Sequence, residues 1–229
     1  MKRRNFLKIS LAALAVPGVV AASPGIWRAN SGALDLAMLE GVECWGGLDL
    51  AGVADFATLR LVWIVDGVLF TAGRRWLPAV AVVQRAEYGT GPYAAWVKAG
   101  LIERTEGDIV DQAAVERGVD EWVARFKIKE LAFDPWSAFG FANRMAAKGT
   151  VTMVEFRQSM KSYHPAMQAL KRHYVNGTLR HGEDPMLAWC MSNLVQRFDR
   201  NLNGRQRPVD DAVALLMATG RAIANKAMM

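Results

Sequence analysis

Aspartates at three places in the chain stand where a carboxylate needs a partner. Asp49 lies within the apolar stretch Trp45-Gly46-Gly47-Leu48-Asp49-Leu50-Ala51-Gly52, Asp134 ends an apolar run before Pro135, and Asp210-Asp211 opens the last long helical stretch. An acid in an apolar element must be ionised for a purpose or hydrogen-bonded at a cost. Close carboxylates repel one another unless a cation lies between them. If the fold brings these acids together, they predict a site for Mg²⁺ or Mn²⁺, which prefer carboxylate oxygens.

Each of these acids also has a purely structural interpretation. Asp210 is a natural helix N-cap, and Asp134, directly before a proline, is a natural turn residue. The residue types alone do not decide between these roles and metal binding. The decision depends on the elements that position the acids.

Hydrophobic periodicity predicts alternating strands and helices around the acids. Strands at 57–65 and 68–73 flank Asp66-Gly67, a dipeptide that closes a two-residue hairpin, so with the Asp49 strand they form an antiparallel meander. The further elements expected are helices at 79–88, 92–99, 111–126, 137–148, 165–175 and 210–226 and strands at 101–105, 128–134 and 151–156.

This order predicts an α/β fold with a ribonuclease-H-like mixed sheet, in which three antiparallel strands and further parallel strands are flanked by helices. In that arrangement the first strand lies beside the strand at 128–134, and the last helix begins nearby. Asp49, Asp134 and Asp210 would then meet. Two divalent cations at such a cluster can activate water and stabilise the leaving oxygen in phosphodiester cleavage.

Composition supports one globular core and a possible nucleic-acid surface. The chain of 229 residues is 52% hydrophobic and 22% charged, which suits a single α/β domain. Its net charge of +6 is concentrated in residues 157–229, which hold 11 basic and 5 acidic residues. A phosphate-facing surface is predicted between 157 and 181, formed by Arg157, Lys161, Lys171, Arg172 and Arg180. The alternative is a solvated basic helix face.

Tryptophans and cysteines receive simpler interpretations. Trp122, Trp136 and Trp189 could stack on bases, but their apolar spacing favours the core. Cys44 and Cys190 are expected to be free buried thiols rather than one disulfide.

Seven segments in order resemble the nuclease domain of the large terminase subunit of tailed bacteriophages over residues 32–225. They are Gly46-Gly47-Leu48-Asp49-Leu50 with Asp55-Phe56-Ala57-Thr58-Leu59, Arg75-Trp76-Leu77-Pro78, Phe133-Asp134-Pro135-Trp136, Phe156-Arg157-Gln158, Trp189 with Asn193, and Val209-Asp210-Asp211-Ala212-Val213-Ala214-Leu215.

The resemblance implies that residues 32–229 form a metal-dependent endonuclease domain that cuts concatemeric phage DNA during packaging. It implies a two-metal Mg²⁺ or Mn²⁺ site on Asp49, Asp134 and Asp210, with Asp211 able to replace or assist Asp210. The implied partners are double-stranded DNA and other packaging proteins, the small terminase subunit and the portal.

The chain departs from the family in one large respect. No Gly-x-x-x-x-Gly-Lys-Ser/Thr phosphate loop occurs in the sequence, so we expect no ATPase activity in this chain and a separate motor if it functions in packaging. Position 211 is aspartate where the family more often has a small residue or proline. The alternative is a non-catalytic prophage remnant that keeps the fold and weak DNA binding.

Residues 1–22 form a leader that resembles a twin-arginine export signal. Arg3 and Arg4 precede an apolar run from Ile9 to Val16 and small residues at 20–22, and the run is too short for a stable membrane anchor. Because a DNA-packaging nuclease has its substrate in the bacterial host cytoplasm, we expect the protein there. A functional leader would instead deliver a folded protein to the periplasm.

Overall fold

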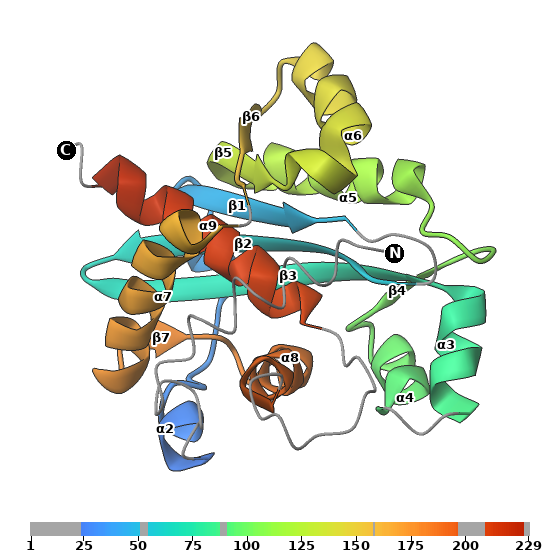
Figure 1. Ribbon diagram of the computed structural model, residues 1–229. Helices are drawn as coiled ribbons and strands as arrows, with labels where there is room; N and C mark the ends of the chain where they lie inside the picture. Colours follow the sequence, from blue (N-terminus) through green and yellow to red (C-terminus); the bar gives the residue numbers. More distant parts are fainter. Residues whose placement is uncertain (1–23, 51–54, 88–90, 158, 197–208, 227–229) are drawn as a thin grey trace.

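The computed structural model describes residues 24–50, 55–87, 91–157, 159–196 and 209–226, and shows a seven-stranded mixed sheet (Figure 1). The strand order is β4-β3-β2-β1-β5-β6, with β7 paired to β3. The strands are β1 (Glu43–Asp49), β2 (Ala57–Val65), β3 (Val68–Pro78), β4 (Glu103–Thr105), β5 (Lys127–Phe133), β6 (Thr152–Glu155) and β7 (Leu179–Arg180). β2 is antiparallel to β1 and β3, and the other pairings are parallel. The predicted meander and the pairing of β1 with β5 are confirmed.

The turn between β2 and β3 is the predicted two-residue hairpin. Asp66 and Gly67 have φ values of 48° and 76°, the left-handed pair that a tight hairpin needs. Every residue of β2 pairs with β3, from Val65 opposite Val68 to Ala57 opposite Trp76. β3 therefore continues well beyond residue 73, where the sequence pattern ended it.

Each predicted helix is present at the expected place. The structure has more helices than predicted, and one helix begins earlier than predicted. They are α2 (Pro24–Ala29), the 3₁₀ turn η1 (Leu36–Leu39), α3 (Ala79–Glu87), α4 (Tyr93–Lys98), α5 (Gln112–Arg125), α6 (Pro135–Lys148), α7 (Met160–Val175), α8 (Pro185–Gln196) and α9 (Asp210–Lys226). α7 begins before the predicted residue 165 because Ser159 caps it, accepting a hydrogen bond from the Ser162 amide, and Pro165 lies inside the helix. The elements α2, η1, α8 and β7 were not predicted.

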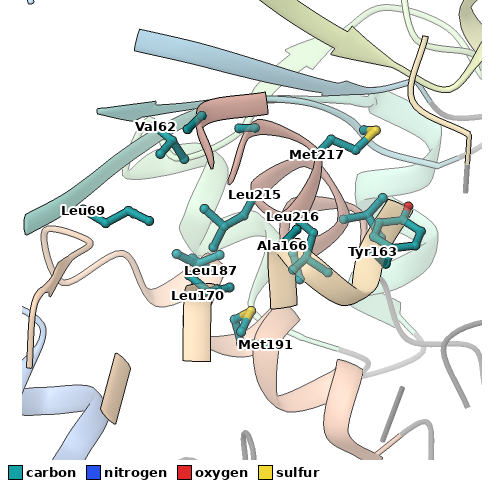
Figure 2. Close-up of a cluster of buried hydrophobic side chains, with 14 of the residues drawn as sticks. Val62, Leu69, Tyr163, Ala166, Leu170, Leu187, Met191, Leu215, Leu216 and Met217 are labelled. Carbon is teal, nitrogen blue, oxygen red and sulfur yellow. The ribbon is translucent and has the colours of Figure 1, made fainter. Parts of the chain in front are cut away.

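The helices cover the two faces of the sheet separately (Figure 1). α9, α7 and α8 bury one apolar cluster against one face, part of which Figure 2 shows around Val62, Leu170 and Leu216. α5 and α6 bury a second cluster against the other face, including Leu48, Leu131 and Phe141. Acids at the end of a strand therefore face one helix layer or the other according to the alternation of side chains along the strand.

Two expectations about the rest of the chain can be compared with the structure. Cys44 and Cys190 are free and buried, as predicted. Among the described residues, none of the helices has the length and apolar character needed to cross a membrane. The leader at 1–22 lies outside the described residues.

Candidate functional site

β1 and β5 end side by side at the same edge of the sheet. One predicted acid, Asp49, closes β1, and another, Asp134, directly follows β5. Leu48 pairs with Phe133 in the parallel register, so Asp49 and Asp134 occupy the next level of the two strands. Asp49 is the last residue of β1 rather than a residue in mid-strand. Gly47 and Ala132, two residues earlier, lie against α9 and its cluster, and side-chain alternation puts Asp49 and Asp134 on the same face. Both aspartates are half-buried.

Asp134 also has a structural role, as a helix cap rather than as the turn residue expected from the sequence. It is the N-cap of α6, where its Oδ1 accepts a hydrogen bond of 3.1 Å from the Trp136 amide. Asp134 therefore caps α6 and also lies at the strand ends beside Asp49.

α9 runs antiparallel to β1 and brings Asp210 to the level of Asp49. Glu130, at the level of Trp45, binds Arg221 and Asn225 near the end of the helix. Gly47 faces Ala214, so closely that a Cβ there would lie 2.1 Å from the Ala214 carbonyl oxygen. From this contact, Asp49 lies about 7 Å farther along the strand and Asp210 about 6 Å farther along the helix, both in the same direction.

We call Asp49, Asp134 and Asp210 the acidic edge. Two buried hydroxyls that the sequence analysis did not select lie beside it. Thr58 pairs directly with Asp49 across β1 and β2, and its Oγ1 is buried without a hydrogen-bond partner. The Tyr163 hydroxyl on α7 is also buried and unpartnered. Burial raises the pKa of Tyr163 well above its usual range, and the charges of Asp49 and Asp134 raise it further, so the phenol remains a proton donor.

Asp211 lies in a different environment from Asp210. Its side chain is fully buried, with Oδ1 accepting from Arg60 Nε at 2.8 Å and Oδ2 from Arg75 Nη2 at 2.6 Å. Asp184 forms ion pairs with the same two arginines. We call Arg60, Arg75, Asp184 and Asp211 the arginine–aspartate quartet. Because both oxygens of Asp211 are used within it, the geometry favours a structural role over the expected replacement of Asp210.

The quartet joins four elements behind the acidic edge. Arg60 comes from β2, Arg75 from β3 and Asp211 from α9, while Asp184 Oδ1 accepts from the amides of Met186 and Leu187 at the start of α8. Burial opposes the charge on Asp184, but Arg60 and Arg75 outweigh it and hold the pKa of this carboxyl below its usual range. Two positive and two negative charges balance, which is how a protein interior can hold ionised groups.

The acidic edge suits a hard cation by the chemistry of its donors. Carboxylate oxygens are the ligands that Mg²⁺ and Mn²⁺ prefer, and the hydroxyls of Thr58 and Tyr163 add polar atoms that have no protein partner. Within the described ranges, however, no three His, Cys, Asp or Glu side chains are gathered closely enough to hold a metal ion as they stand. The fit therefore depends on the shared strand-end position and on the donor set.

The predicted basic surface divides into two groups. Arg157 follows β6 near the level of Asp134, and Lys161 lies in the first turn of α7; both are exposed near the acidic edge. Arg172 lies about 16 Å farther along α7, next to Lys171. Arg180 lies on β7 opposite Phe70, at the other end of the sheet. The structure thus keeps Lys171, Arg172 and Arg180 apart from the acids.

The three tryptophans do not share one environment. Trp122 is buried in the core, as expected, and Trp189 is half-buried against Tyr93 and Trp96. Trp136 is 67% exposed, so its expected core position is wrong. α6 buries Ala138, Phe141, Ala142 and Met145 instead, and Trp136 lies outside that stripe.

Some residues of the site could have been found from sequence and others could not. Arg60 stands between Leu59 and Leu61 in an apolar strand, which signals a buried cation that needs an acid. Nothing in the local sequence of Asp184, Thr58 or Tyr163 gives a comparable signal, because their roles arise from distant partners.

Comparison with known proteins agrees with this architecture. Residues 27–226 match the family model described as terminase large subunit, endonuclease domain. The chain is 31% identical over 189 residues to the terminase large subunit of Enterobacteria phage HK97, covering 78% of this chain and 37% of that protein. It is 27% identical over 210 residues to protein YmfN of Escherichia coli (strain K12), covering 83% and 45%.

A solved structure gives the same result for the fold. The crystal structure of the HK97 bacteriophage large terminase matches with a TM-score of 0.75 and 27% sequence identity, covering 87% of this chain and 43% of that one. This chain therefore spans less than half the length of these relatives. The strand order, the helix layers and the match over residues 27–226 lead to one conclusion: the chain belongs to the endonuclease-domain family of the terminase large subunit, with its ribonuclease-H-like fold.

Proposed function

We propose that this chain is a divalent-metal-dependent endonuclease that cuts DNA phosphodiesters. The observation that carries the proposal is the acidic edge, where Asp49 closes β1, Asp134 follows the adjacent parallel strand β5, and Asp210 begins the helix packed against both strands. Asp49, Asp134 and Asp210 would hold Mg²⁺ or Mn²⁺, preferably two ions. When bound, such ions activate water and stabilise the leaving oxygen.

The chain's own side chains would bind and orient the substrate at this edge. The three carboxylates would act as the ligands, and the hydroxyls of Thr58 and Tyr163, which are buried beneath the surface, would hydrogen-bond to the carboxylates or to a bound water rather than to DNA. Exposed Arg157 and Lys161 attract the DNA backbone, with little readout of sequence.

We further propose that the reaction belongs to phage genome packaging in the bacterial host cytoplasm, on double-stranded DNA. The named relatives are more than twice as long as the matched region. By family, partners would include the small terminase subunit and the portal, and a separate ATPase motor if the chain acts in packaging.

The test is nicking of supercoiled plasmid by the full chain with Mn²⁺, Mg²⁺ or chelator. Asp49→Asn and Asp134→Asn should abolish metal-dependent nicking. Asparagine also caps helices, so Asp134→Asn removes the charge and keeps the cap of α6. Asp111→Asn is the matched control, because Asp111 caps α5 in the same way through the Ala113 amide and lies outside the acidic edge.

The alternative outcome is equally definite. A folded wild-type chain that nicks no plasmid and gains no thermal stability from Mn²⁺ would overturn the catalytic proposal. It would leave the non-catalytic remnant as the explanation of the fold.

A further inference from the structure

α6 begins directly beyond Asp134 and presents two aromatic side chains to solvent. Trp136 is 67% exposed and Phe139 is 57% exposed. They are three residues apart, so they lie on the same side of the helix. Both lie outside the buried stripe of α6, which consists of Ala138, Phe141, Ala142 and Met145. Exposed aromatic side chains beside a candidate site offer ring faces on which a nucleic-acid base can stack.

α6 and the α5 acids paired with it carry no net charge. The helix contains no acid, and its two basic residues, Arg144 and Lys148, are paired with Glu116 and Asp120 of α5. The exposed aromatic side therefore adds no repulsion toward DNA. At the end of the neighbouring β6, exposed Arg157 contributes a positive charge and exposed Glu155 a negative one.

The backbone connects this surface to the acidic edge. The Trp136 amide donates a hydrogen bond to Asp134 Oδ1, so Trp136 lies two residues from a proposed metal ligand and within the same turn of the chain. Each phosphate of DNA is bonded to two nucleosides. A phosphate that a cation would hold at Asp134 therefore brings its own bases toward the surface around that residue.

We propose that Trp136 and Phe139 form an aromatic platform on which bases of the DNA strand stack beside the phosphodiester to be cut. The location of the platform rests on the proposed nuclease function, but its binding of DNA does not require cleavage. Stacking on a side chain needs a base with an exposed face. The platform therefore prefers single-stranded or locally opened DNA to an intact duplex.

The test measures binding by the full chain in chelator, where no metal-dependent cleavage takes place. The ligands are a labelled single-stranded oligonucleotide, read by anisotropy, and the same strand carrying 2-aminopurine, read by fluorescence quenching. A Trp136→Ala, Phe139→Ala double variant should bind the single strand about 10- to 100-fold more weakly, as expected for one or two lost base stacks. It should also lose the quenching. Trp136→Tyr should retain most of both signals.

Two other exposed apolar residues provide matched controls. Met38, 78% exposed in η1 before the start of β1, and Val175, 58% exposed at the last residue of α7, lie toward the ends of β1 and α7 that are opposite the acidic edge. Met38→Ala and Val175→Ala should bind as the wild type does.

Three results would overturn the platform. They are a wild-type chain that does not bind the oligonucleotide, a double variant that binds as tightly as the wild type, and an equal loss in Met38→Ala. The second result would be expected if the aromatic pair contacts another protein instead. If the wild-type chain does not nick plasmid but the double variant loses DNA binding, the nuclease proposal is overturned and the platform stands. If the wild-type chain nicks plasmid and the double variant binds DNA as tightly as the wild type, the platform is overturned and the nuclease proposal stands.

Discussion

Asp210 and Asp211 are neighbours in the chain and differ in almost every physical respect. Asp210 is half-buried and level with Asp49 at the acidic edge, whereas Asp211 is buried in the arginine–aspartate quartet with each oxygen bound by an arginine. Successive residues of a helix point about 100° apart, so one side chain can face the strand ends while the next enters the interior. The first turn of α9 thus separates a proposed chemical role from a structural one.

The two environments also differ in how their charges are balanced. The quartet contains its own countercharges, two arginines for two aspartates. The acidic edge places three carboxylates at neighbouring strand and helix ends, where we propose that they bind cations. If this difference is correct, substitutions in the quartet should reduce stability, and substitutions at the acidic edge should reduce activity.

The largest effect is expected from Asp211→Asn. The change removes one buried negative charge and leaves Arg60 and Arg75 short of a countercharge, so the free energy of unfolding should fall by about 3–5 kcal/mol. Urea denaturation measures this directly. Asp35→Asn is the control, because Asp35 is an exposed cap of η1 and asparagine caps as well. A fall of less than about 1 kcal/mol in Asp211→Asn would mean that the quartet is not a major stabilising element.

Asp210→Asn should give the opposite pattern. Metal-dependent nicking should fall by about 100-fold or more, equivalent to about 2.7 kcal/mol, because one proposed cation ligand is lost. The free energy of unfolding should change by less than about 1 kcal/mol, since the residue stays polar and half-buried. Plasmid nicking and urea denaturation of the same preparation make the comparison. Normal nicking by Asp210→Asn would contradict the assignment of this residue to the acidic edge.

Gly47→Ala should reduce stability and activity together, because it moves α9, the helix that carries both Asp210 and Asp211. A Cβ at Gly47 would collide with the backbone of Ala214, which cannot swing away as a side chain can. We expect a loss of about 1–3 kcal/mol of stability, together with reduced nicking. Gly140→Ala is the control, because a Cβ there meets no atom closer than 3.8 Å. Unchanged nicking in a destabilised Gly47→Ala chain would show that the position of α9 does not govern the site.

Acid should weaken the quartet in a defined direction. The pKa of Asp184 is lowered in the folded chain, so its contribution to stability is present above about pH 4 and is lost as the pH falls below that value. Urea midpoints of the wild type between pH 6 and pH 2 should therefore fall more steeply than those of Asp184→Asn. Parallel curves would contradict an ionised, arginine-paired Asp184.

The sequence was sufficient for features that local patterns determine. The apolar runs at β1 and β5 and the predicted strand order brought Asp49 and Asp134 to neighbouring parallel strands, although Asp49 closes β1 instead of lying within it. The hairpin at Asp66-Gly67 followed from the φ values that only a few residue types adopt readily.

The remaining features depend on partners far away in the chain. Periodicity places α9, but the rotation that buries Asp211 is set by Arg60 and Arg75, more than a hundred residues earlier. Trp136 was assigned to the core because hydrophobicity alone does not say which side of α6 meets the sheet. Pro165 concealed the start of α7 because proline is most common in the first turn of a helix, and here it lies deeper.

The smallest effects should separate the two ends of α7. Lys161 and Arg172 are both exposed on this helix, about 16 Å apart, and Lys161 is the one near the acidic edge. Lys161→Ala should weaken duplex binding a few-fold and lower the slope of log affinity against log salt by about 0.9, the value for one lost phosphate contact. Arg172→Ala should change neither quantity. Equal losses would mean that DNA lies along the whole of α7, and the region of DNA contact would then extend well beyond the acidic edge toward Arg180.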